Sequence, residues 1–114
     1  MTNIYDDINK LEATFRQTTE FEALKVAVEA VRADDEARTL FTNFRDIQNK
    51  LQQKQTNGEE LLEDEYNYLQ KAAQLAQGNT KILAMLEAEM AMSAILEQVN
   101  EALVTPIQSL YDGL

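Results

Sequence analysis

Apolar residues recur every three to four positions along nearly the whole chain, which is the spacing of one face of an α-helix. The pattern is longest between Asn79 and Tyr111. Gly78 suits the end of a preceding helix, and Asn79 suits the N-cap of the next. A bulky seam keeps heptad-like spacing: Ile82, Met85, Met92, Leu96, Val99 and Leu103. An adjacent seam is smaller: Ala84, Ala88, Ala91, Ile95 and Ala102. The pattern predicts one long helix whose broad apolar face touches two neighbours.

A third apolar stripe lies among glutamates on the other side of this helix. Its residues are Leu83, Leu86, Met90 and Ala94. In a monomer this stripe would face water, and contiguous exposed apolar surface commonly marks an interface. Two interpretations stay open: another helix of the same chain covers the stripe, or the stripe is an interface with a second copy or another protein.

The length of the predicted helix favours an interface. The helix would extend about 50 Å at 1.5 Å per residue, whereas a compact domain of this size is roughly 34 Å across. Thr105-Pro106 suits a kink or a new helix start. Because Ile107, Leu110 and Tyr111 continue the apolar face, we expect a bend there and not a new domain.

Four shorter helices precede the long one. Asn3 suits the N-cap of the first, and Thr19 with Glu22 forms a capping box for the second. The third begins at Asp34 or Asp35 and ends at Asn57-Gly58. The fourth begins near Leu62 or Glu63 and ends at Gly78. Their predicted core faces are Ile4, Ile8, Leu11 and Phe15; Phe21, Leu24, Val28 and Val31; Ala37, Leu40, Phe41, Phe44, Ile47 and Leu51; and Leu62, Tyr66, Leu69, Ala73 and Ala76.

Short connections make sequential helices antiparallel. The predicted fold class is therefore all-α: antiparallel helical hairpins, or a bundle of about five helices with a long C-terminal helix. Residues 1–114 are expected to form a single helical domain. Tyr66 and Tyr68 are two positions apart and cannot share a helix face, so we expect one in the core and one exposed.

The net charge of the chain argues against some classes of binding partner. The 114 residues include 20 acidic and 10 basic side chains, for a net charge of −10. Direct binding to DNA or another nucleic acid is not expected, because such affinity comes largely from neutralising phosphates. An anionic membrane is disfavoured for the same reason. No stretch suits a signal peptide or a membrane span, so the cytoplasm is the expected location.

No catalytic residue is predicted, and the protein is not expected to be an enzyme. Nucleophilic catalysis needs an activated side chain beside a base, and the chain has neither Cys nor His. A Ser–Lys pair would have to use Ser93 or Ser109, and both fit solvated surface positions better.

No cofactor or metal site is predicted either. The acidic cluster Glu59–Glu65 lacks the spacing of a calcium loop, and a di-iron bundle needs Glu-x-x-His. The cluster fits a helix N-terminus with solubilising charge. A basic stripe on the third helix comprises Arg38, Arg45, Lys50 and Lys54, and in so acidic a chain it fits an ion-paired face better than a nucleic-acid site.

The third helix carries a family resemblance. Ala33-Asp34-Asp35-Glu36-Ala37, Leu40-Phe41, Phe44-Arg45-Asp46, Gln48, Leu51-Gln52-Gln53-Lys54-Gln55 and Gly58-Glu59-Glu60 resemble the YheA/YmcA/YlbF family of small bacterial proteins. The opening Asn3-Ile4-Tyr5-Asp6 and the closing Pro106-Ile107 to Leu110-Tyr111 are similar too. The resemblance covers nearly the whole chain and is greatest to the YheA branch, whose molecular function is not established. Leu62 departs from the Thr or Ser cap expected in relatives.

This resemblance implies an all-α, often self-associating protein of the bacterial cytoplasm. The YlbF and YmcA branches act in a complex that modulates RNA processing dependent on RNase Y, and they are associated with iron–sulfur clusters held by cysteines. A chain without Cys does not inherit that cluster.

Three functional hypotheses follow. The leading one is a non-enzymatic interaction or regulatory protein that forms a homodimer or larger homo-oligomer through its long helices. The second is an accessory factor of RNA processing, with a protein partner in that pathway, that would bind RNA through Arg38, Arg45, Lys50 and Lys54. The third is a protein that binds metal through carboxylates.

Overall fold

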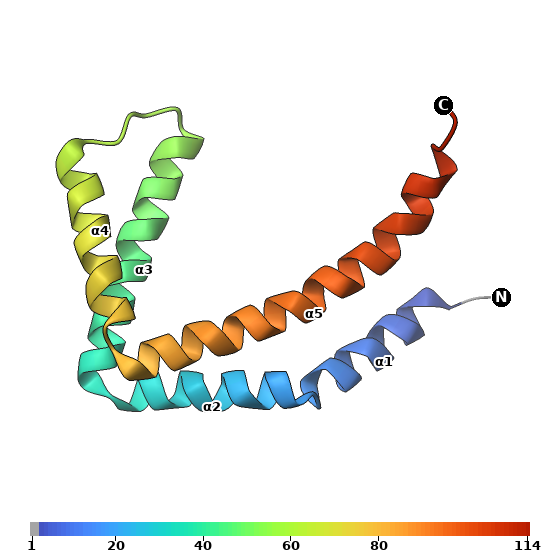
Figure 1. Ribbon diagram of the computed structural model, residues 1–114, viewed down its shortest axis with the longest axis horizontal. Helices are drawn as coiled ribbons and strands as arrows, with labels where there is room; N and C mark the ends of the chain where they lie inside the picture. The colour runs from blue at the N-terminus through green and yellow to red at the C-terminus, as the bar shows by residue number, and fades with distance from the viewer. Residues whose placement is uncertain (1–2) are drawn as a thin grey trace. The chain divides into compact units, whose positions relative to one another are not determined.

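The computed structural model describes residues 3–114, which form five α-helices and, within that range, no strand. The helices are α1 (Ile4–Arg16), α2 (Thr19–Ala33), α3 (Asp35–Thr56), α4 (Glu63–Gln77) and α5 (Thr80–Leu110) (Figure 1). The predicted all-α fold with a long C-terminal helix is confirmed.

Polar side chains start three of these helices where the sequence predicted them. The side-chain oxygens of Asn3, Asp34 and Asn79 accept hydrogen bonds from backbone N–H groups two or three residues further on. Each side chain thereby satisfies donors that the first turn of a helix leaves without a partner. The third of these caps sets the beginning of α5.

The cap of α2 differs from the prediction by one residue. The hydroxyl of Thr18, and not that of Thr19, accepts a hydrogen bond from the Phe21 N–H at 3.1 Å. The same hydroxyl donates to the Phe15 carbonyl at 2.8 Å. Thr18 therefore ends α1 and starts α2. The predicted capping box with Glu22 is wrong, because the residue three positions after Thr18 is Phe21.

α4 begins without a polar side chain at its N-cap, Leu62. The Glu65 carboxylate instead accepts a hydrogen bond from the Leu62 N–H at 3.1 Å. In a capping box, the side chain of the third helical residue accepts a hydrogen bond from the N-cap N–H in this way, and here only that half of the motif is formed by side chains. Gly58, in the turn after α3, has a φ of 75°, a left-handed conformation that favours glycine.

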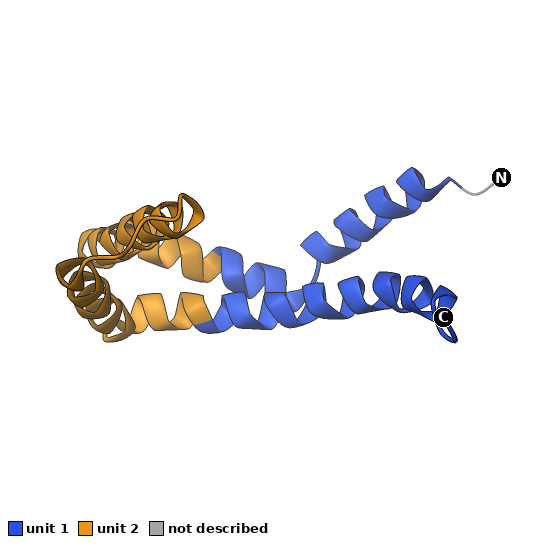
Figure 2. Ribbon diagram, turned by 90° about the horizontal axis from the view of Figure 1, so that it is seen from above, with its two compact units in different colours: residues 1–25, 87–114 blue, residues 26–86 orange. Residues whose placement is uncertain are grey.

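The chain divides into two compact units, which are coloured separately in Figure 2. Unit 1 comprises residues 1–25 and 87–114, and unit 2 comprises residues 26–86. α2 and α5 each contribute to both. The expectation of a single domain stays a prediction.

Unit 2 holds most of the buried apolar side chains. Those chains are Val31, Ala37, Leu51, Ala76, Ile82 and Met85. Within it, α3 and α4 form an antiparallel hairpin, packed side by side (Figure 1). Two ion pairs reinforce the unit: Lys54 contacts Glu65, and Lys81 contacts Asp34, each at 2.7 Å.

Unit 1 is less well packed. Met92 is its buried residue on α5, and α1 has none. Phe15 and Phe21 meet edge to face across the junction of α1 and α2, with ring centroids 6.0 Å apart. α5 continues through Pro106 to Leu110, so the proline does not end the helix. A bend at Pro106 stays a prediction; Figure 1 draws α5 as one uninterrupted helix.

Candidate interaction surfaces

The predicted stripe on α5 lies at the surface to different degrees along its length. Met90 is 72% exposed, Leu83 is 42% exposed, Ala94 is exposed and Leu86 is half-buried. Residues of an interface have to be exposed when the partner is absent, but exposure alone does not show that a partner binds them. The assignment of these four residues to an interface stays a prediction.

A second apolar surface on α5 was not predicted. Leu96 and Leu103 belong to the bulky seam that the sequence predicts to touch neighbouring helices, yet they are 54% and 62% exposed. They lie on the same helix face as buried Met92, and exposed Ile107 and Leu110 continue that face. We call Leu96, Leu103, Ile107 and Leu110 the distal seam. It is exposed because α1, the other terminal helix of unit 1, buries no side chain against it.

The apolar face of α1 is also at the surface. Ile4, Ile8 and Leu11 are exposed, whereas Phe15 is half-buried. The prediction that this face belongs to the core is therefore wrong for about its first two turns. The periodicity identified the face correctly, but it carries no information about what covers it.

The two tyrosines of α4 are a further correction. Tyr66 and Tyr68 are both 54% exposed, so neither is the core residue that the sequence predicted. The covered face of α4 consists of Leu69, Ala72, Ala73 and Ala76. At 100° per residue the tyrosines flank this face on opposite sides. Small residues let α3 approach closely and leave both rings outside.

One carboxylate of the acidic cluster after α3 forms an ion pair that holds two helices together, and the others form none within residues 3–114. The Lys54 ammonium donates a hydrogen bond to Glu65 at 2.7 Å, and this contact, with the Leu62 N–H, holds the pKa of that carboxyl below its ordinary value. Glu59, Glu60, Glu63 and Asp64 are exposed, and none forms an ion pair within residues 3–114. In the same range, no three Asp or Glu side chains are grouped to hold a metal ion.

Asp34 has a similar structural role at the start of α3. The Lys81 ammonium and the Ala37 N–H both donate to its carboxylate, and they hold the pKa of Asp34 below its ordinary value. The ion pair fixes the beginning of α5 to the beginning of α3. The lowered pKa values of Asp34 and Glu65 are explained by contacts that hold helices together, and they do not indicate a catalytic site.

Some residues of the predicted basic stripe form ion pairs and others do not. Lys54 pairs with Glu65, and Arg38 pairs with Asp35 at 2.8 Å. The stripe is therefore partly the ion-paired face that the sequence suggested. Arg45, by contrast, forms no ion pair in the described part of the chain.

Arg38 and Arg45 join a third arginine, Arg32, around a groove that the sequence analysis missed. The groove has a volume of about 310 Å³. It is lined by Val28, Val31, Arg32, Arg38, Phe41, Thr42, Arg45 and Met85. The sequence signal was weak because Arg32 comes from α2 and the other two arginines come from α3.

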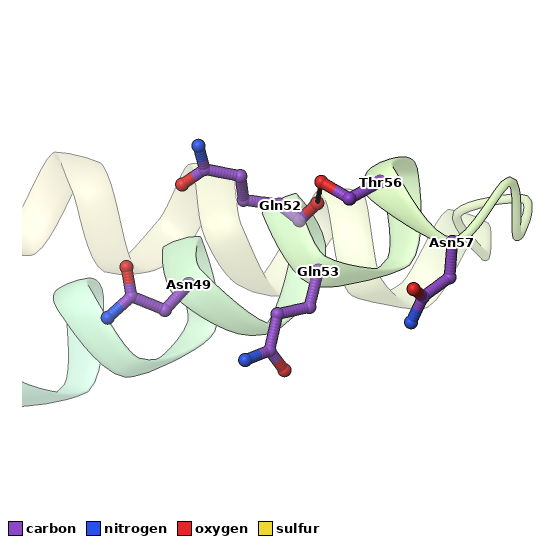
Figure 3. A pocket seen from close by; sticks show the side chains of 5 residues that line it. All are labelled: Asn49, Gln52, Gln53, Thr56 and Asn57. Carbon is purple, nitrogen blue, oxygen red and sulfur yellow. Dashed lines mark hydrogen bonds between the residues drawn. The ribbon is translucent and has the colours of Figure 1, made fainter.

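The last turns of α3 carry an uncharged polar surface. Asn49, Gln52, Gln53, Thr56 and Asn57 line an open hollow of about 520 Å³ (Figure 3). The Thr56 hydroxyl donates to the Gln52 carbonyl at 3.0 Å. Amides can form hydrogen bonds with a partner, but they supply neither a nucleophile nor a charge for catalysis.

The two serines considered as possible nucleophiles, Ser93 and Ser109, are both exposed on α5. No helix within residues 3–114 combines the length and the hydropathy that crossing a bilayer requires.

Comparisons with known proteins agree with the fold. Residues 4–108 match the family model described as "Control of competence regulator ComK, YlbF/YmcA". A UPF0342 protein of Lysinibacillus sphaericus is 62% identical over 114 residues, covering 100% of this chain and 99% of the relative. The UPF0342 protein YheA of Bacillus subtilis is 40% identical over 112 residues, covering 98% and 96%.

Two solved structures are similar along almost their whole lengths. A protein of unknown function (DUF964) from Bacillus stearothermophilus has a TM-score of 0.87 and 35% identity, covering 97% of each chain. The yheA structure from Bacillus subtilis has a TM-score of 0.75 and 32% identity, covering 96% of this chain and 100% of that one. The resemblance found in the sequence is thus confirmed, and the chain belongs to the YlbF/YmcA family, within its UPF0342 group, and is homologous to YheA of Bacillus subtilis.

Proposed function

We propose that this protein is a non-enzymatic regulatory protein whose working form is a homo-oligomer assembled through α5. The observation that carries the proposal is the distal seam, an apolar helix face that is buried at Met92 and then exposed as far as Leu110. The description of the family model, which concerns control of a competence regulator, supports a regulatory role.

A second copy of the chain is the occupant that best fits the distal seam. The seam continues a face that is already used for packing, and it presents large aliphatic side chains seven, four and three positions apart. Two such helices can pack against each other by placing ridges in grooves. Only Glu97 and Glu101 are charged between Leu96 and Leu110, so two seams can meet with little local repulsion.

The stripe of Leu83, Leu86, Met90 and Ala94 is the alternative surface for the same assembly. By helical spacing it lies on the opposite side of α5 from the distal seam. Both surfaces can be tested with one kind of substitution, because a glutamate that must be buried without a partner is strongly unfavourable.

The experiment compares Leu103→Glu, Met90→Glu and Gln98→Glu with the unchanged protein by sedimentation velocity. Gln98 is exposed on α5 away from the distal seam, so its variant controls for the added charge in the test of that seam; it lies four positions after Ala94, at the end of the stripe. We expect Leu103→Glu to dissociate the oligomer and Gln98→Glu to leave it intact. Dissociation by Met90→Glu alone would place the interface on the stripe. A protein that sediments as a monomer at tens of micromolar would contradict self-association altogether.

A further inference from the structure

The arginine groove of unit 2 is unusual for so acidic a molecule. Three guanidinium groups, from Arg32, Arg38 and Arg45, surround one groove in a chain of net charge −10. Arg38 is committed to Asp35 and to the Arg32 carbonyl, whereas Arg32 and Arg45 form no ion pair within residues 3–114. The groove therefore has unused positive charge.

The floor of the groove is apolar. Val31 and Met85 are buried there, and Val28 and Phe41 are half-buried. The Arg45 guanidinium lies 5.9 Å from the centroid of the Phe41 ring, a cation–π distance that keeps the charge at the rim. A fitting ligand would combine at least one apolar group with several negative charges.

The same chain carries a segment with that chemistry. The end of the connection between α3 and α4, with the first two residues of α4, reads Glu59-Glu60-Leu61-Leu62-Glu63-Asp64, and it contains no basic residue. Leu62 is 62% exposed, and the four acidic side chains around it are exposed without ion pairs in the described residues. We call Glu59–Asp64 the acidic turn.

A molecule cannot place its acidic turn in its own groove. Arg38 and Arg45 precede Thr56, the end of α3, by roughly 27 Å and 16 Å at 1.5 Å per residue. The ion pair of Lys54 with Glu65 holds the start of α4 at that far end of α3. The turn is thus kept away from the groove of its own unit, and only a second copy can bring the two together.

We infer that the acidic turn of one copy docks in the arginine groove of another, with Leu62 on the apolar floor and the neighbouring carboxylates at the arginines. Arginine suits this role because its planar guanidinium binds carboxylates through two parallel hydrogen bonds. Several such contacts around a buried leucine are needed, because single surface ion pairs are weak.

This contact joins two different surfaces, so each copy keeps one free groove and one free turn. Such a heterologous contact builds rings or open chains rather than a closed pair. It is separate from association through α5 and does not depend on it. A regulatory protein with this contact would assemble further when its concentration rises and dissociate when salt rises.

The first test uses a fluorescein-labelled peptide of residues 57–66 and the full-length protein, followed by fluorescence anisotropy. We expect binding at about 50 mM salt that weakens about tenfold at 500 mM. Arg32→Glu combined with Arg45→Glu should abolish the binding, and a peptide with Leu62→Ala should bind more weakly. Lys10→Glu combined with Arg16→Glu makes the same change of charge at two exposed positions of α1, and this matched control should bind normally.

The second test exploits complementation between copies. Arg45→Glu alters the groove, and Glu63→Arg alters the turn, so each variant alone should lose the salt-sensitive assemblies in sedimentation velocity. An equal mixture should form salt-sensitive one-to-one pairs, because the intact turn of one variant meets the intact groove of the other, and the altered groove and turn that remain cannot extend the pair into a chain. Formation of these pairs would also show that both variants are folded.

Three results would overturn the inference. Peptide binding that is unchanged by Arg32→Glu with Arg45→Glu would place the turn elsewhere. Failure of the mixed variants to assemble, when the unchanged protein does, would exclude the pairing. Tighter binding of a single-stranded RNA oligonucleotide than of the peptide, lost in the arginine variant, would assign the groove to nucleic acid. None of these results depends on Leu103, so the proposal for α5 stands or falls separately.

Discussion

At the scale of the residue, Thr18 determines how the first two helices are joined. Its hydroxyl donates to Phe15 and accepts from Phe21, so Thr18→Ala removes both hydrogen bonds. We expect a loss of about 1 kcal/mol in the free energy of unfolding, which is the usual effect of losing an N-cap. Thermal unfolding followed by circular dichroism should show a Tm lowered by about 4 °C in Thr18→Ala and a nearly unchanged Tm in Thr18→Ser. An equal effect of Thr19→Ala would contradict the assignment of the cap.

Glu65 gives the protein a pH-dependent contribution to stability. Its pKa in the folded chain lies below the ordinary value of 4.5, because Lys54 and the Leu62 N–H stabilise the carboxylate. A carboxyl whose pKa is lowered by folding stabilises the fold above its unfolded pKa, and this contribution is lost as pH falls through the folded pKa. The Tm advantage of the unchanged protein over Glu65→Gln should therefore be greatest near pH 6 and shrink below about pH 4. Glu59→Gln is the control, because Glu59 forms no ion pair within residues 3–114.

At the scale of the element, the hairpin of α3 and α4 depends on small side chains. Ala76 is 1% exposed on the covered face of α4. Ala76→Leu adds three carbon atoms at a position that is already fully covered, and overpacking of this kind costs about 1–3 kcal/mol. Ala23→Leu makes the same change at an exposed position of α2 and should alter stability by less than about 0.5 kcal/mol. Urea unfolding monitored by circular dichroism would separate the two variants, and equal midpoints would mean that the hairpin is not closely packed.

The elements also show how far the sequence could be read. Asn3, Asp34 and Asn79 mark helix starts because capping is local, so their positions were predictable. Thr18 and Thr19 are adjacent and chemically equivalent, and only the backbone distinguishes them. Burial was less predictable, because periodicity defines an apolar face without defining its cover. The faces of α1 and the distal seam look like core in the sequence, yet they are exposed. The arginine groove was invisible because its charges come from separate helices.

At the scale of the whole molecule, the two assemblies proposed above respond to salt in opposite directions. Association through the distal seam brings together two chains that each carry a net charge of −10, and salt screens their mutual repulsion. Docking of the acidic turn in the arginine groove depends on attraction, and salt weakens it. Sedimentation velocity between about 50 and 500 mM salt should therefore show larger assemblies at low salt and a discrete oligomer that persists at high salt. Leu103→Glu should remove the persistent oligomer alone, whereas Arg45→Glu should remove the larger assemblies alone. If one substitution removed both species, the chain would use a single interface, and the two surfaces would have to be parts of one contact.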